Sequence, residues 1–171
     1  MPQDDAIARL ARQISATEKA ERLLVDSEHV ARLRREGACD LHGICAEFVS
    51  SVNRKLSGAM LDLSPLEYSG EVFREPGVNL FQIGSQGRQV QIAFQAPAGL
   101  SSTEKFPIPY VLEGELRTFN QKMLEHFDVR SRLIFFCVEN DRALWRHYDW
   151  RTRATGPLSG EVLAGLLQPL F

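Results

Sequence analysis

The chain has 171 residues, of which 44% are hydrophobic and 25% are charged, and its formal net charge is −2. This size and composition are typical of a globular chain that buries roughly two thirds of its unfolded surface, so no disulfide or metal is needed for folding. The near-neutral charge lacks the strong positive field that attracts nucleic acid or an anionic membrane surface, which argues against both partners.

The cysteines and the first residues of the chain bear on its compartment. There are three cysteines, Cys39, Cys45 and Cys137, and the N-terminal residues are acidic and polar. An odd number of cysteines without a secretory signal favours reduced thiols. The longest apolar run is far shorter than the roughly 20 residues that cross a bilayer. We therefore expect a cytoplasmic protein without a membrane span.

Residues 4–36 carry a helical pattern. Ile7, Leu10 and Ile14 recur at spacings of three and four residues, which places them on one apolar face. Asp26 is a suitable N-cap inside the segment. The pattern therefore leaves open whether residues 4–36 form one helix or several.

A further helix is expected after a break at Gly37, because glycine commonly ends helices. Asp40 can cap the new helix, and Ser57-Gly58 can end it. Its apolar stripe follows helical spacing and consists of Leu41, Ile44, Cys45, Phe48, Val52 and Leu56.

The period of the apolar pattern changes from helix to strand after Pro65. Alternating runs separated by turn residues predict strands at 78–83, 89–95, 110–118, 132–139 and 143–150. In the third of these, Leu112, Gly114 and Leu116 fall on one face, and Glu113, Glu115 and Arg117 on the other. The pattern is typical of an antiparallel sheet with one solvated face.

The segments between these strands are assigned from turn residues. Residues 97–109 contain three prolines and are expected to form the longest loop, and residues 120–127 are expected to form a helical turn. Asn140-Asp141 predicts a tight hairpin turn. A last helix is expected over 159–167, with Ser159 as its N-cap.

The order of elements predicts an α+β fold. N-terminal helices precede a curved antiparallel sheet of about six strands, and a C-terminal helix follows. The helices should pack on one face of the sheet, because each strand has one apolar face and each helix one apolar stripe. We expect one domain over 1–171, with a helical region at 1–58, the sheet at 67–150 and the last helix at 158–170.

The first candidate for chemistry is Cys39-x2-His42-x2-Cys45. Thiols and imidazoles bind zinc, but steps of three residues drift by about 60° around a helix of ~3.6 residues per turn. The donors therefore do not share one face. We interpret Cys45 as buried, Cys39 as lying at a helix start and His42 as solvent-facing or capping, and we expect no metal.

The second candidate lies in residues 142–153, where arginines alternate with aromatic residues. Such a segment can bind single-stranded nucleic acid or line a pocket for an anionic ligand. On a strand, alternation separates its side chains onto two faces, as in any ordinary sheet. The candidate ligand-binding residues are Trp145, Arg146, His147, Tyr148, Asp149 and Arg151.

Two groups of titratable side chains could take part in catalysis. His147 and Asp149 could act as a base and its orienting carboxylate, but no nucleophile motif accompanies them. Glu113 and Glu115, with Glu71 and Glu75 on an earlier strand, could flank a substrate or hold a cation. The polar face of an amphipathic sheet is the preferred explanation, because Arg117 and Arg88 supply partners of opposite charge on that face. We assign no catalytic residue and no cofactor.

The leading functional hypothesis is a small intracellular binding or protein-interaction module without catalytic activity. It is expected to form a homodimer or to bind another protein, because the N-terminal helices carry more apolar surface than one small sheet can cover. A second hypothesis is a small-molecule cup or enzyme with a pocket near residues 144–151. Binding of single-stranded nucleic acid through the Arg/Trp segment ranks last.

Overall fold

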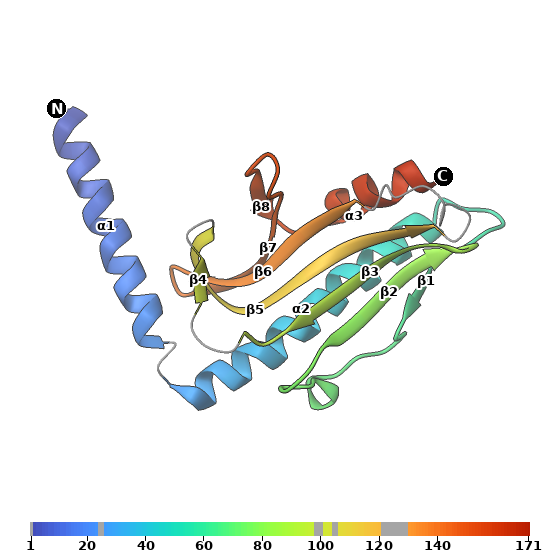
Figure 1. Cartoon of the computed structure of the whole chain (residues 1–171), viewed down its shortest axis with the longest axis horizontal. Helices are drawn as coiled ribbons and strands as arrows, with labels where there is room; N and C mark the ends of the chain where they lie inside the picture. The colour runs from blue at the N-terminus through green and yellow to red at the C-terminus, as the bar shows by residue number, and fades with distance from the viewer. Residues whose placement is uncertain (1, 24–25, 98–100, 104–105, 121–129) are drawn as a thin grey trace.

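A computed structural model of the chain describes residues 2–23, 26–97, 101–103, 106–120 and 130–171 (Figure 1). Helices α1 (Pro2–Leu23) and α2 (Ser27–Asn53) precede an antiparallel sheet, and α3 (Gly160–Leu167) follows it. Short 3₁₀ turns, η1 (Gly70–Val72) and η3 (Gln168–Leu170), complete the described helical elements. The expected α+β class is confirmed.

The sheet contains eight strands within the described residues. They are β1 (Asp62–Ser64), β2 (Asn79–Ser85), β3 (Arg88–Gln95), β4 (Ser101–Thr103), β5 (Phe106–Asn120), β6 (Ser131–Glu139), β7 (Arg142–Tyr148) and β8 (Thr155–Pro157). Their order is β1-β2-β3-β5-β6-β7-β8, with β4 paired to β5 outside this path. The prediction of about six strands is exceeded by the three-residue strands β1, β4 and β8, which are too short to show alternation. The earlier strand expected around Glu71 and Glu75 is wrong, because these residues lie in η1 and in the bend that follows it.

Helix α2 runs without a break through the residues that were expected to separate two helices. Gly37 is not a helix stop, and Asp40 is not a cap. A Cβ atom at Gly37 would lie 2.5 Å from the Phe136 ring, and the Gly37 carbonyl accepts a hydrogen bond from the Trp145 indole N–H at 2.7 Å. Glycine therefore serves here to bring the helix close to the sheet.

The ends of α2 are set by side-chain hydrogen bonds. The Asp26 carboxylate accepts hydrogen bonds from the backbone N–H groups of Glu28 and His29, which confirms it as the N-cap. Residues 4–36 therefore span two helices. Helix α2 ends at Asn53, before the predicted Ser57-Gly58. There the Asn53 side chain accepts a hydrogen bond from the Leu61 backbone N–H at 2.8 Å and donates one to the Leu61 carbonyl at 2.9 Å.

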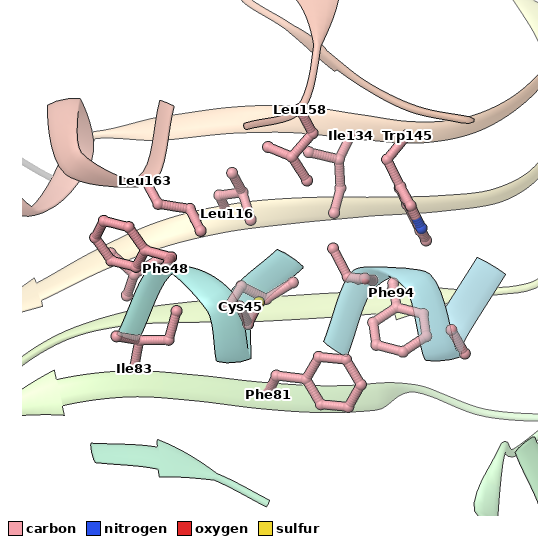
Figure 2. Close-up of a cluster of buried hydrophobic side chains, with 14 of the residues drawn as sticks. Cys45, Phe48, Phe81, Ile83, Phe94, Leu116, Ile134, Trp145, Leu158 and Leu163 are labelled. Atoms are coloured by element: carbon pink, nitrogen blue, oxygen red, sulfur yellow. The ribbon is translucent and has the colours of Figure 1, made fainter. Parts of the chain in front are cut away.

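The main core lies between helices α2 and α3 and one face of the sheet (Figure 2). Burying a large apolar side chain contributes about 1.5–3 kcal/mol relative to exposure, so this layer supplies most of the driving force for folding. Its labelled members in the close-up are Cys45, Phe48, Phe81, Ile83, Phe94, Leu116, Ile134, Trp145, Leu158 and Leu163. We call the opposite side of the sheet the helix-free face.

Three connections differ from the sequence-based expectation. In the described part of the predicted loop at 97–109 the chain instead forms β4 and the start of β5, and Pro107 and Pro109 lie inside β5. Asn120 ends β5, and the rest of the predicted helical turn lies outside the described residues. Strand β7 ends at Tyr148, because the backbone N–H of Asp149 bonds the Ala154 carbonyl and closes a turn.

The predicted hairpin turn and the predicted N-cap of the last helix agree with the structure. Asn140 and Asp141 have φ values of 47° and 63°, the positive values that a tight hairpin turn requires, so this prediction is confirmed. Ser159 occupies the N-cap position of α3, although its side chain makes no capping hydrogen bond.

Candidate functional site

Strand β7 separates the six candidate residues instead of bringing them together. Trp145 pairs with Phe136 and His147 with Ile134, both of which face α2, whereas Arg146 pairs with Phe135 on the helix-free face. Tyr148 also lies on the helix-free face. Asp149 and Arg151 belong to the turn after the strand. No single pocket is therefore formed by these six side chains.

Trp145 is a core residue. Only 3% of its surface is exposed, and its indole N–H donates to the Gly37 carbonyl at 2.7 Å. Its ring packs edge-on against Phe94, with a centroid distance of 6.0 Å, and against Phe136 at 5.4 Å. These contacts join α2 to the sheet and leave no surface of Trp145 for a ligand.

The charged candidates are engaged in ion pairs and backbone contacts. Arg146 bonds Glu139 at 2.8 Å, and Asp149 pairs with Arg132. A hydrogen bond from the backbone N–H of Arg151 is the main cause that lowers the pKa of Asp149. The guanidinium of Arg151 lies 5.2 Å from the centre of the Trp150 ring.

His147 is not held by Asp149 as a catalytic base would be. Its Nδ1 atom is buried and has no hydrogen-bond partner among the residues that the structure describes. Burial, followed by the charge of Arg132, lowers the pKa of His147 below its ordinary value of 6.5. The folded protein therefore favours the neutral form of the ring.

The lowered pKa of His147 gives a pH-dependent stability. The unfolded chain binds a proton at His147 near pH 6.5, whereas the folded protein binds it only at lower pH. We therefore expect the free energy of unfolding to fall as the pH drops from 7.5 to 5.5. His147→Gln should reduce this loss. Urea denaturation at both pH values measures the effect, and an equal loss in the wild type and the variant would contradict it.

The Cys-His-Cys motif lies inside α2. Cys45 is buried in the core, where burial raises the pKa of its thiol to about 12. His42 is buried, not solvent-facing or capping as expected, because its Nε2 atom bonds the Pro65 carbonyl at 2.8 Å and its ring stacks on Tyr68. Burial also raises the pKa of Cys39. Across the described part of the chain, no three His, Cys, Asp or Glu side chains gather as metal ligands would.

The helix-free face carries a hollow that sequence patterns did not reveal. Its volume is about 630 Å³, and it lies over β3, β5, β6 and β7. The lining is mostly apolar and aromatic, with two carboxylates: Val78, Ala93, Phe94, Gln95, Phe106, Tyr110, Glu113, Gly114, Glu115, Leu133, Phe135, Tyr148 and Trp150. The apolar residues of β6 on both faces were the only signal of a second buried layer.

An aromatic cluster forms one end of this hollow. The rings of Phe106 and Phe135 stack with centroids 4.2 Å apart, and Tyr148 approaches Phe106 at 5.7 Å. Phe135 also contacts Tyr110 at 4.6 Å. Because these rings pack on one another, the wall of the hollow is preformed.

Helix α1 presents a second apolar surface. Ile7, Leu10 and Ile14 are 62%, 56% and 59% exposed. The helix extends away from the sheet, and its C-terminal half approaches the β6–β7 hairpin, where Lys19 pairs with Asp141 at 3.2 Å (Figure 1). We call these three residues the α1 stripe. None of its three residues belongs to the buried apolar clusters of the described chain.

Comparison of the chain with protein-family models, curated proteins and solved structures found no match. Within the described residues, no helix has both the length and the apolar character that crossing a membrane demands. The function must therefore be argued from the surfaces themselves.

Proposed function

We propose that the protein is a non-catalytic protein-interaction module that forms a homodimer through α1. The observation that carries this proposal is the exposed α1 stripe. A helix in water gains most of its stability by packing an amphipathic face, so a 22-residue helix with an uncovered stripe calls for a partner. A second copy supplies an identical stripe and gives a closed assembly.

The spacing of the stripe suits a parallel helix pair. Ile7, Leu10 and Ile14 follow the alternating three- and four-residue steps of a coiled coil. In the seven-residue repeat of a coiled coil, lettered a to g, isoleucine then occupies the a positions and leucine the d position. This combination favours a pair of parallel helices. In this arrangement each stripe residue meets the same residue of the second copy.

The charges beside the stripe favour the same arrangement. In a parallel pair the flanking positions bring Ala6 close to Ala11 of the second copy, so no like charges face each other there. An antiparallel pair that overlaps over the whole stripe brings Asp4 close to Glu18 of the other helix. Like charges at such positions are destabilising.

The other two hypotheses receive less support. Tyr148 alone of the six candidate residues lines the hollow, so a catalytic or small-molecule site made of the whole set is not favoured. Arg146 and Arg132 are paired with carboxylates, which reduces their attraction for phosphates. A cytoplasmic location remains part of the proposal, supported by three free cysteines.

The dimer is tested by the molar mass in solution. By light scattering after size exclusion, the full chain should have twice its monomer mass of 19.3 kDa. Leu10→Glu should shift the protein to monomer, because two buried carboxylates would face each other in the stripe. Ala8→Glu adds the same charge outside the stripe and should stay dimeric. A wild-type monomer, or equal effects of both substitutions, would refute the proposal.

A further inference from the structure

We propose that the helix-free face is a docking site for an amphipathic helix of another protein, one that carries lysine or arginine beside its apolar stripe. This site is separate from the α1 stripe and goes beyond the proposed dimer. Its floor is the hollow over β3, β5, β6 and β7.

The strands beneath the hollow have no free edge, so a helix is the form of partner that fits there. Strand β3 is paired with β2 and β5, β5 with β3 and β6, and β6 with β5 and β7. Their backbone groups are therefore already bonded within the sheet, and an added strand would find no free edge at this place. Recognition must instead use side chains, as when an amphipathic helix lies in an apolar groove. Helix α2 covers the opposite face of the same sheet in this way.

The apolar part of the hollow fits the stripe of such a helix. Leu133 and Ala93 are partly buried at its floor, and the aromatic cluster of Phe106, Phe135 and Tyr148 forms one wall. Trp150 is 55% exposed at its margin. Aromatic residues are enriched in protein interfaces and are common anchors there.

The charge of the hollow decides the chemistry of the partner. Glu113 and Glu115 line it, whereas none of its described lining residues is a lysine or arginine. Arg117, outside the lining, bonds Glu115 at 2.9 Å, and the amide of Gln95, a lining residue, lies 3.5 Å from Glu113. Among the described residues, Arg117 is therefore the one cation paired with either carboxylate. A basic side chain beside the apolar stripe would complete the pairing.

The same charges exclude α1 of a second copy as the occupant. The residues next to the α1 stripe at helical spacing are Asp4 and Glu18, which would meet the carboxylates of the hollow. Arg9 and Arg12 lie on the opposite side of α1 from its stripe at 100° per residue. The hollow and α1 therefore need different partners.

The test uses two synthetic 18-residue helical peptides and the full chain. Both peptides have the same leucine stripe, flanked by lysine in one and by glutamate in the other. Fluorescence anisotropy should show at least about tenfold tighter binding of the leucine/lysine peptide, and this preference should weaken with added salt. Glu113→Gln with Glu115→Gln should remove most of the preference. Glu47→Gln with Glu161→Gln, an equal change of charge on α2 and α3, should preserve it.

Three outcomes would overturn the docking site. They are equal binding of the two peptides, equal effects of the two double substitutions, and equal binding of a leucine/lysine peptide in which prolines prevent helix formation. The dimer is judged separately, because the Leu10→Glu variant should bind the leucine/lysine peptide as the wild type does. Loss of peptide preference in a dimeric protein would refute this inference alone.

Discussion

Replacement of Trp145 by alanine is expected to lower the free energy of unfolding by about 3–5 kcal/mol, as large-to-small changes at buried aromatic residues do. Trp145 is 3% exposed and contacts both Phe94 and Phe136. The substitution also leaves the Gly37 carbonyl without its indole partner. Both losses act at the joint between α2 and the sheet, so the whole core should be weakened.

Chemical denaturation of the full chain measures this effect. Trp150→Ala is the matched control, because Trp150 is 55% exposed and its loss should change stability by no more than about 0.5 kcal/mol. Trp145→Ala should leave the peptide preference of the folded protein intact, since the side chain lies on the other face. A stable Trp145→Ala protein with altered peptide binding would contradict the core role and indicate that Trp145 takes part in binding.

Gly114→Ala is expected to destabilise the sheet by about 1–3 kcal/mol, the usual effect of overpacking. A Cβ atom at Gly114 would lie 2.5 Å from the Ala93 carbonyl oxygen and 2.8 Å from the Phe94 Cβ. Neither neighbour is the free end of a flexible side chain. Strand β3 would have to move away from β5, directly beneath the hollow.

Gly165→Ala provides the control of opposite sign. Gly165 lies in α3, and a Cβ atom there would meet nothing within 4 Å. Because alanine is favoured over glycine in a helix by about 1 kcal/mol, this variant should be as stable as the wild type or more stable. Thermal and urea denaturation of both variants distinguish them. Equal stability of Gly114→Ala and the wild type would contradict the close packing of β3 on β5.

Local patterns predicted much of the fold because each element follows its own period. The stripe from Leu41 to Val52 is helical, and Glu113 and Glu115 lie on the face opposite Leu112, as alternation required. The predicted helix break at Gly37 was wrong for a physical reason. A glycine inside a helix is indistinguishable in sequence from a stop until the ring that packs on it, Phe136, is known.

The placement of the six candidate residues in space could not be predicted for a related reason. Alternation along β7 correctly separates Trp145 from Arg146, but it does not say which face is covered by a helix. The hydrogen bond from Trp145 to Gly37 joins residues 108 positions apart. The hollow likewise combines side chains from four strands. The apolar residues on both faces of β6 indicate a second buried layer, but they do not show which other strands complete it.

The most direct test of the α1 dimer is disulfide cross-linking of the full chain with a cysteine in place of Leu10. A parallel pair brings this position opposite itself in the second copy, so mild oxidation should yield a covalent dimer. Ala8→Cys, outside the stripe, should cross-link much more slowly, and the wild type reports any contribution from the native thiols. Preferential dimer formation by Leu10→Cys is the predicted result. Equal rates for the two variants, or no cross-linked dimer of Leu10→Cys, would contradict pairing through the α1 stripe.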